Sequence, residues 1–255
     1  MSQRDLLHTG DLYFPNDPSI MADQLKYLDR LYDFNQTRPT ELKKREKLLK
    51  KMFAELGEGC YIEPPLHTNM GGHHVHFGSN IYANFGLTLG EDTHIYVGDY
   101  TMFGPHVTVA TAGHPIEPGL REKGMQYNMP VRIGRNCWIG AGAVILPGVT
   151  IGDNVVIGAG AKVLGPFTVG AGAKIGASAV VLKEVPPFST VVGNPGRVVR
   201  QNNQKIAIDL DQVNLPDPVK ERIESLERRI YELEAHIHNV NGTNHVKEDI
   251  KNADL

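Results

Sequence analysis

The chain has 255 residues, 41% of them hydrophobic, and a formal net charge of −3 at pH 7, which allows a sizeable core in one or two domains. The slightly negative charge and the lack of a basic patch interleaved with aromatic residues exclude a typical nucleic-acid-binding protein. The two cysteines, Cys60 and Cys137, exclude a disulfide framework and fit a reducing compartment. The sequence shows neither a signal peptide nor an apolar run of membrane-spanning length, so we expect a cytoplasmic protein with no membrane partner.

Residues 1–57 predict an N-terminal helical segment. Asp17-Pro18 and Pro39-Thr40 each open an amphipathic stretch, with proline at or next to the first helical position. In the first stretch, the apolar residues expected on one side of the helix are Met21, Leu25, Leu28, Leu31 and Tyr32.

Residues 58–200 are expected to form one mainly β domain, because they carry a six-residue repeat. Every sixth residue is β-branched and aliphatic at Ile133, Ile139, Ile145, Ile151, Ile157, Val163, Val169, Ile175 and Val181. A helix repeats every 3.6 residues and a strand every two, so neither explains this period. A period of six predicts short strands joined by corners and wound into a solenoid, with the aliphatic side chains inside.

The residues that follow these aliphatics repeat as Gly, Gly, Leu, so three hexads make one turn of eighteen residues. Allowing for a slip of two residues near position 95, the phase predicts about five turns at 77–94, 97–114, 133–150, 151–168 and 169–186. Residues 115–132 break the pattern, since Pro115, Arg121 and Tyr127 would fall at interior positions. We interpret them as an excursion loop, a type of segment that is often functional.

Residues 201–255 are predicted to hold a linker, a helix at about 217–239 and a disordered tail. Apolar residues in the helix alternate by four and three, as in a coiled-coil seam, at Val219, Ile223, Leu226, Ile230, Leu233 and Ile237. Arg222 with Glu227, and Arg229 with Glu234, are spaced for pairing between parallel copies. Packing of this face onto the helix's own chain is the alternative.

Four segments together resemble the galactoside and maltose O-acetyltransferases over about residues 8–160. They are Tyr82-Ala83-Asn84-Phe85, Thr111-Ala112-Gly113-His114-Pro115, Asn128-Met129-Pro130 and Asn136-Cys137-Trp138-Ile139-Gly140. The resemblance implies a left-handed parallel β-helix, a homotrimer with active sites between subunits, and acetyl-CoA as the acetyl donor. From about Ala161 the C-terminal third resembles serine acetyltransferases instead, and adds one complete turn.

For the reaction, the resemblance makes His114 the general base that takes a proton from a sugar hydroxyl as the hydroxyl attacks acetyl-CoA directly. Histidine suits this task because its pKa is ordinarily close to neutrality. Asn84 is implied as a catalytic and acceptor-binding residue. The other implied acceptor-binding residues are Asp17, Asn69, Tyr82 and Asp92. For Asp17 and Asn69, helix or turn capping is the alternative.

For the cofactor, Ala141, Ala159 and Ala177 form a ladder eighteen residues apart whose small side chains leave room for a pantetheine arm. Trp138 would border that groove, or else pack on a neighbouring subunit. The resemblance places Lys183, Arg197 and Arg200 at the nucleotide end, where cations suit phosphates. The additional turn leaves Lys162 or Lys174 as alternatives.

His73, His74 and His76 lack a partner carboxylate or cysteine at ligand spacing, so we expect no metal site. The sequence favours an acetyl-CoA-dependent sugar O-acetyltransferase acting on a galactoside, maltose or glucose type of acceptor. A serine O-acetyltransferase and a non-catalytic trimeric scaffold are the alternatives.

Overall fold

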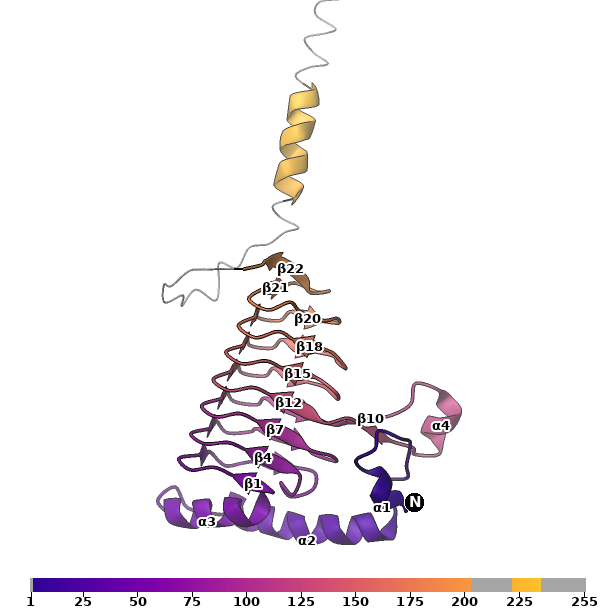
Figure 1. Ribbon diagram of the computed structural model, residues 1–255, viewed down its shortest axis with the longest axis vertical. Coiled ribbons are helices and arrows are strands. Elements are labelled where there is room, and N and C mark those ends of the chain that lie inside the picture. The colour runs from indigo at the N-terminus through magenta and orange to yellow at the C-terminus, as the bar shows by residue number, and fades with distance from the viewer. Residues whose placement is uncertain (1, 203–221, 235–255) are drawn as a thin grey trace, which may run out of the picture. The chain divides into compact units, whose positions relative to one another are not determined.

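The computed structural model describes residues 2–202 and 222–234. The chain divides into two compact units, Met1–Leu215 and Pro216–Leu255. The first unit is a solenoid of short strands with helices at its N-terminal end (Figure 1). No helix within the described ranges is both long and apolar enough to span a membrane.

Three helices precede the solenoid: α1 (Gln3–Leu6), α2 (Pro18–Asn35) and α3 (Leu42–Met52). Figure 1 shows α2 and α3 lying across the end of the solenoid, below β1. Four of their buried residues, Leu31, Phe34, Leu49 and Met52, belong to the same core cluster as the solenoid interior. The face predicted for α2 is wrong in part, because Met21, Leu25 and Tyr32 are exposed. These helices cover the apolar end of the coil.

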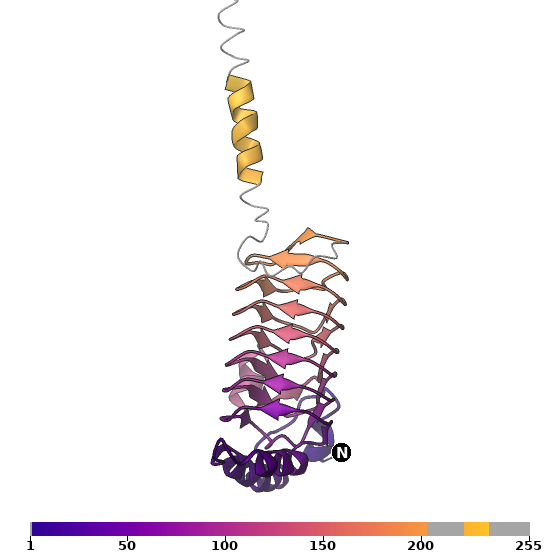
Figure 2. The ribbon, with the colours of Figure 1, turned by 90° about the vertical axis from the view of Figure 1, so that its left-hand side faces the viewer.

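The solenoid strands form three sheets, each with one strand per coil. The first sheet contains β1 (Glu55–Leu56), β4 (Val75–Phe77), β7 (Ile95–Val97), β12 (Val131–Ile133), β15 (Thr150–Ile151) and β18 (Thr168–Val169). The second contains β2 (Tyr61–Ile62), β5 (Tyr82–Ala83), β8 (Met102–Phe103), β13 (Trp138–Ile139), β16 (Val156–Ile157), β19 (Lys174–Ile175), β21 (Thr190–Val192) and β22 (Arg197–Arg200). The third contains β3 (His67–Thr68), β6 (Thr88–Gly90), β9 (Thr108–Ala110), β14 (Val144–Ile145), β17 (Lys162–Val163) and β20 (Val180–Val181). Pairing is parallel except between β21 and β22. Figure 2 shows successive strands stacked along the axis.

The prediction of about five turns is wrong: the described strands make six complete coils, and β21 starts another. The missed coil is the first, β1 to β3, whose strand β1 already begins within the segment expected to be helical. Tyr61 pairs with Tyr82, twenty-one residues later, and Tyr82 pairs with Met102, twenty residues later. The hexad phase is therefore lost at this end of the chain.

From β12 to β20 the predicted eighteen-residue register is confirmed, with Ile133 opposite Ile151 and Ile151 opposite Val169. After β20 the spacing shortens, and Ile175 pairs with Val191, sixteen residues later. The large and small interior positions are filled as expected, and Ile145 and Ala143 are both completely buried. Such a column of stacked aliphatic side chains gives each coil a continuous apolar interior, which is what stabilises a repeat protein.

An arm leaves the solenoid after the third sheet, where the sequence led us to expect an excursion at 115–132, and the solenoid resumes with β12 at Val131. In the arm, β10 (Ala112–Gly113) pairs antiparallel with β11 (Tyr127–Asn128), and the short helix α4 (Pro118–Glu122) lies between them. Figure 1 shows this arm projecting from the solenoid next to the N-terminal segment around α1. Val131 pairs with Ile95, two eighteen-residue periods earlier, so the excursion takes the place of one coil without shifting the register.

In the second unit, residues 222–234 form a helix, and every one of them is exposed. The seam residues Ile223, Leu226, Ile230 and Leu233 are between 44% and 56% exposed. The ends of the helix predicted at 217–239, and the tail predicted to be disordered, lie outside the described residues.

Candidate active site

His114 lies where β10 ends and the excursion arm begins. Its Nδ1 is 3.0 Å from the carbonyl oxygen of Met125, at the other end of the arm. A carbonyl oxygen only accepts hydrogen bonds, so Nδ1 carries the ring proton and Nε2 keeps a free lone pair. The His114 side chain is exposed. Its ring is thus held by the backbone in the tautomer that can accept a proton from a substrate.

A polar pair lies close to His114. The Nδ2 of Asn69, after β3, donates to the Oδ1 of Asp92, after β6, at 2.7 Å. Burial raises the pKa of Asp92, while hydrogen bonds from Gln126 and Asn69 and the electrostatic interaction with His114 lower it. The structure therefore brings together three of the residues expected in the site: Asn69, Asp92 and His114.

Sequence reasoning missed the side chains that hold this pair. Gln126 Nε2 lies 3.1 Å from Asp92 Oδ1 and 2.5 Å from the hydroxyl of Tyr13. Asn128 Nδ2 donates to the same hydroxyl at 3.0 Å and to the Leu7 carbonyl at 3.0 Å. Burial raises the pKa of Tyr13 to about 12. These hydrogen bonds connect the N-terminal segment to the excursion arm next to Asp92.

A pocket of about 240 Å³ opens at this junction. It is lined by Leu7, Tyr13, Pro15, Asn16, Ile20, Met21, Gln24, Asn69, Met70, Asp92 and Gln126. Its mixture of carboxylate, amide and hydroxyl groups with aromatic and aliphatic walls is suited to a polyhydroxylated ligand.

Asp17 caps α2. Its Oδ1 accepts from the backbone N–H of Ser19 at 2.9 Å and from the Ser19 hydroxyl at 2.6 Å. These hydrogen bonds lower the pKa of the Asp17 carboxyl. Asp17 is not among the residues that line the pocket, whereas Pro15 and Asn16 are. The observed contacts of Asp17 therefore support helix capping, the alternative role that the sequence left open.

Tyr82 lies on β5 of the second sheet and Asn84 directly follows this strand. Both residues are therefore on a different edge of the solenoid from His114. Asn84 Oδ1 accepts from the backbone N–H of Phe85 at 2.8 Å. The exposed ring of Tyr82 stacks parallel to Tyr61, with 6.0 Å between ring centroids. Among the described residues no hydrogen bond joins either side chain to His114 or to Asp92.

The alanine ladder is present at the corner between the second and third sheets. Gly160 N–H donates to the Ala141 carbonyl, and Ser178 N–H to the Ala159 carbonyl, both at 2.8 Å. Ala141, Ala159 and Ala177 are all exposed. Trp138 is 39% exposed on β13, three residues before Ala141.

The candidate cations are more widely distributed. Lys183 follows β20 of the third sheet, whereas Arg197 and Arg200 lie on β22 at the end of the second sheet. All three are exposed. Of the alternatives, Lys162 lies on β17 and Lys174 on β19.

The histidines at which the sequence predicts no metal site belong to a cluster of aromatic rings. His76 Nε2 is 2.9 Å from His94 Nδ1, and His8 stacks on His94. Burial lowers the pKa of His74, and that of His94, to about 4. Within residues 2–202 and 222–234, no group of three or more His, Cys, Asp or Glu side chains is arranged to hold a metal ion.

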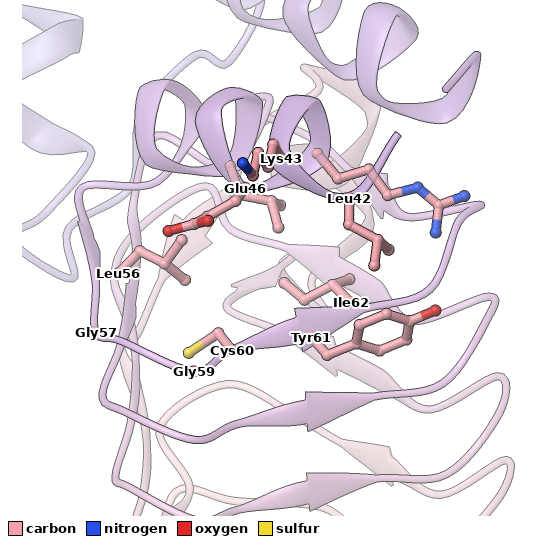
Figure 3. Close-up of a pocket in the computed structure, with 11 residues that line it drawn as sticks. Leu42, Lys43, Glu46, Leu56, Gly57, Gly59, Cys60, Tyr61 and Ile62 are labelled. Atoms are coloured by element: carbon pink, nitrogen blue, oxygen red, sulfur yellow. The ribbon is translucent and has the colours of Figure 1, made fainter. Parts of the chain in front are cut away.

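A second pocket of about 240 Å³ lies between α3 and the first coil (Figure 3). It is lined by Leu42, Lys43, Arg45, Glu46, Leu49, Leu56, Gly57, Gly59, Cys60, Tyr61 and Ile62. Burial raises the pKa of the Cys60 thiol, which disfavours a thiolate nucleophile. Neither pocket has a histidine among its described lining residues, but Asp92 interacts electrostatically with His114, so the pocket beside Asp92 is the better candidate.

Comparisons with known proteins show which proteins this chain is similar to. Residues 130–165 match the family described as bacterial transferase hexapeptide (six repeats), and residues 7–57 match the maltose acetyltransferase hexapeptide capping motif. A galactoside O-acetyltransferase of Lactococcus lactis is 54% identical over 56% of this chain and 69% of its own length. That of Escherichia coli is 38% identical over 80% of this chain and 92% of its own length. A solved galactoside acetyltransferase in complex with coenzyme A is 36% identical, covers 84% of this chain and 100% of its own, and superposes with a TM-score of 0.69.

Proposed function

Because this chain belongs to the galactoside O-acetyltransferase family of hexapeptide-repeat proteins, we propose that it acetylates a hydroxyl group of a galactoside, maltose or glucose type of sugar. It is an acetyl-CoA-dependent O-acetyltransferase. The observation that carries the proposal is the hydrogen bond from His114 Nδ1 to the Met125 carbonyl at 3.0 Å, next to the Asn69–Asp92 pair. It leaves Nε2 free to act as the base.

The reaction then runs in one complex of enzyme, donor and acceptor. The sugar oxygen attacks the thioester carbonyl carbon as its proton moves to His114 Nε2, the carbon–sulfur bond breaks, and the proton passes to the sulfur of CoA. General base catalysis of this kind contributes about 10²- to 10⁴-fold. Burial raises the thiol pKa of Cys60 and of Cys137, which supports a transfer with no acetyl-enzyme.

The acceptor would lie in the pocket beside Asp92, with Asn69 as a second polar contact. Asp17, at the start of α2, would contact the acceptor only if its helix-capping hydrogen bonds were broken. Tyr82 and Asn84, on another edge of the solenoid, would serve the His114 of a neighbouring subunit. The outer face of the second sheet supports self-association, because it carries a row of exposed apolar side chains, one in each of the first four coils: Tyr61, Tyr82, Met102 and Trp138. Such contiguous exposed apolar rows are typical of interfaces.

The pantetheine arm of CoA would lie along the ladder formed by Ala141, Ala159 and Ala177, with Trp138 at its border. Lys183, Arg197 and Arg200 are the proposed partners of the nucleotide phosphates, with Lys162 and Lys174 as alternatives. Family membership also supports the left-handed winding predicted for the coil. The likeness of the C-terminal third to serine acetyltransferases, and the cytoplasmic location, stay predictions.

The C-terminal helix would pair with the same helix of other copies. Its described part leaves Ile223, Leu226, Ile230 and Leu233 exposed on one seam. Arg222 and Glu227, and Arg229 and Glu234, would pair across a parallel interface. Isoleucine and leucine in this order favour two strands, so a trimer would require the solenoid to set the number.

The test is release of CoA thiol from acetyl-CoA in the presence of galactosides, maltose, glucose, chitooligosaccharides or serine. Release with a sugar supports the proposal. Release with serine alone would make the protein a serine O-acetyltransferase, and the absence of release with every acceptor would favour a non-catalytic scaffold.

A further inference from the structure

Glu91 is a buried carboxylate next to Asp92 that the proposed reaction does not use. Its side chain is 0% exposed. Oε1 accepts from the backbone N–H groups of Met70 at 2.8 Å and Gly72 at 2.7 Å, and Oε2 accepts from that of Asn69 at 2.9 Å. One side chain at the end of β6 thus holds residues 69–72, the turn that follows β3.

No ion pair among the described residues compensates the charge of Glu91. Burial raises its pKa to about 7, although the backbone N–H groups lower it. A buried carboxylate without a cation costs folding free energy. Groups kept at such a cost are concentrated at functional sites, and the turn that Glu91 holds borders the pocket beside Asp92.

The turn carries Asn69, whose position is set from three directions. Glu91 holds its backbone N–H, Gln24 Nε2 from α2 donates to its carbonyl oxygen at 3.0 Å, and its own Nδ2 donates to Asp92 at 2.7 Å. Met70, the next residue, lines the pocket beside Asp92. A shift of the turn would therefore move one wall of the pocket and one of the two hydrogen bonds to Asp92 Oδ1.

We propose that Glu91 is the positioning residue of the acceptor pocket: its carboxylate fixes the turn 69–72, so that Asn69 and Asp92 meet the acceptor in a fixed geometry. The inference rests on the proposed function in taking this pocket as the acceptor site. Glu91 touches neither acceptor nor donor, so it acts on acceptor binding and not on the chemical step.

The ionised form suits this role better than the neutral form, because a protonated carboxyl would place a donor among three N–H donors. Two titratable groups adjoin Glu91: Asp92, the next residue along the chain, and His74, whose Nδ1 lies 2.9 Å from the Glu91 backbone carbonyl oxygen. His8 and His73, in ring contact with His74, have pKa values lowered by burial, as does His74 itself. Protonation of Glu91 should loosen the turn, so the acceptor KM should rise as the pH falls below about 7.

The test compares wild-type protein with Glu91→Gln and with the control Asp99→Asn, which alters a carboxylate that accepts from a backbone N–H at another corner. Glu91→Gln should raise the acceptor KM about tenfold, with kcat and the acetyl-CoA KM within about twofold of wild type. It should also speed hydrogen exchange of the amides of residues 69–72, and the control should do neither. A lower kcat with unchanged acceptor KM, or unchanged hydrogen exchange, overturns the proposal.

Two further measurements test the role of Glu91 if the first experiment cannot be carried out. If Glu91→Gln does not fold, the acceptor KM of the wild-type protein is measured between pH 8 and pH 5.5, and a flat profile overturns the proposal. If the wild-type protein acetylates no sugar, the proposed function fails by itself, and hydrogen exchange of residues 69–72 between pH 8 and pH 5.5 still decides whether the ionised Glu91 holds the turn.

Discussion

Replacing Asp92 by asparagine should separate acceptor binding from folding. In the structure, Asp92 Oδ1 lies 2.7 Å from Asn69 Nδ2 and 3.1 Å from Gln126 Nε2. No hydrogen bond from another of the described residues reaches Oδ2, which leaves this atom for the acceptor. The Oδ1 of asparagine can still accept from both amides, so Asp92→Asn keeps the internal contacts and changes only the group that meets the sugar.

The magnitude follows from the lost charge. A hydrogen bond to a charged group contributes about 1.5–3 kcal/mol and a neutral one about 0.5–1.5 kcal/mol. The difference of about 1–2 kcal/mol corresponds to a fall of about 5- to 30-fold in kcat/KM for the acceptor. The thermal midpoint should stay close to that of wild type.

The assay is CoA thiol release at saturating acetyl-CoA with the acceptor varied, together with a thermal melt of each protein. Asp153→Asn is the matched control, because its Oδ1 accepts from the Arg135 backbone N–H at 2.8 Å at a corner far along the chain from the arm. An Asp92→Asn enzyme with wild-type kcat/KM, or an equal loss in the control, would refute the reasoning.

Three further predictions concern the base, a corner and a buried histidine. His114→Ala should lower kcat by about 10²- to 10⁴-fold and leave the oligomeric state of the protein unchanged, and normal turnover would refute its role. Gly152→Ala should lower the free energy of unfolding by about 1–3 kcal/mol, because its Cβ would lie 2.7 Å from the Ala171 backbone nitrogen; an unchanged urea midpoint would contradict this. Burial lowers the pKa of His74 from 6.5 to about 4, so the unfolded chain binds a proton that the folded chain does not, and stability falls as the pH drops through this window. Between pH 6.5 and pH 4, the thermal midpoint of His74→Gln should therefore fall less than that of the wild-type protein. Protonation of Glu91 has the opposite effect on stability, but it occurs in both proteins. An equal fall in the two thermal midpoints would contradict the prediction.

The sequence predicts the solenoid because its interior positions are periodic. Where a coil is longer than eighteen residues, as between Tyr61 and Tyr82, the six-residue period is lost. For this reason the sequence does not predict the first coil. The buried face of α2 was misjudged for a related reason. A helix lying across the end of a solenoid buries the residues that meet the core, such as Phe34, and not the whole of its apolar stripe.

The candidate site was predicted only where local sequence carries a motif. His114 ends a recognisable turn, and Asn69 and Asp92 stand where the family resemblance implies acceptor contacts. Tyr13 and Gln126 give no such signal, because they meet across more than a hundred residues of chain. Their contact depends on how the N-terminal segment folds against the arm, which no repeat or short motif encodes.

The most direct test of the central claim is a crystal structure of the protein with CoA and a galactoside bound together. We predict a sugar hydroxyl at about 2.6–3.2 Å from Nε2 of His114, with the same sugar in contact with Asp92. A sugar bound in the pocket beneath α3, or with every hydroxyl beyond reach of the imidazole, would contradict the account.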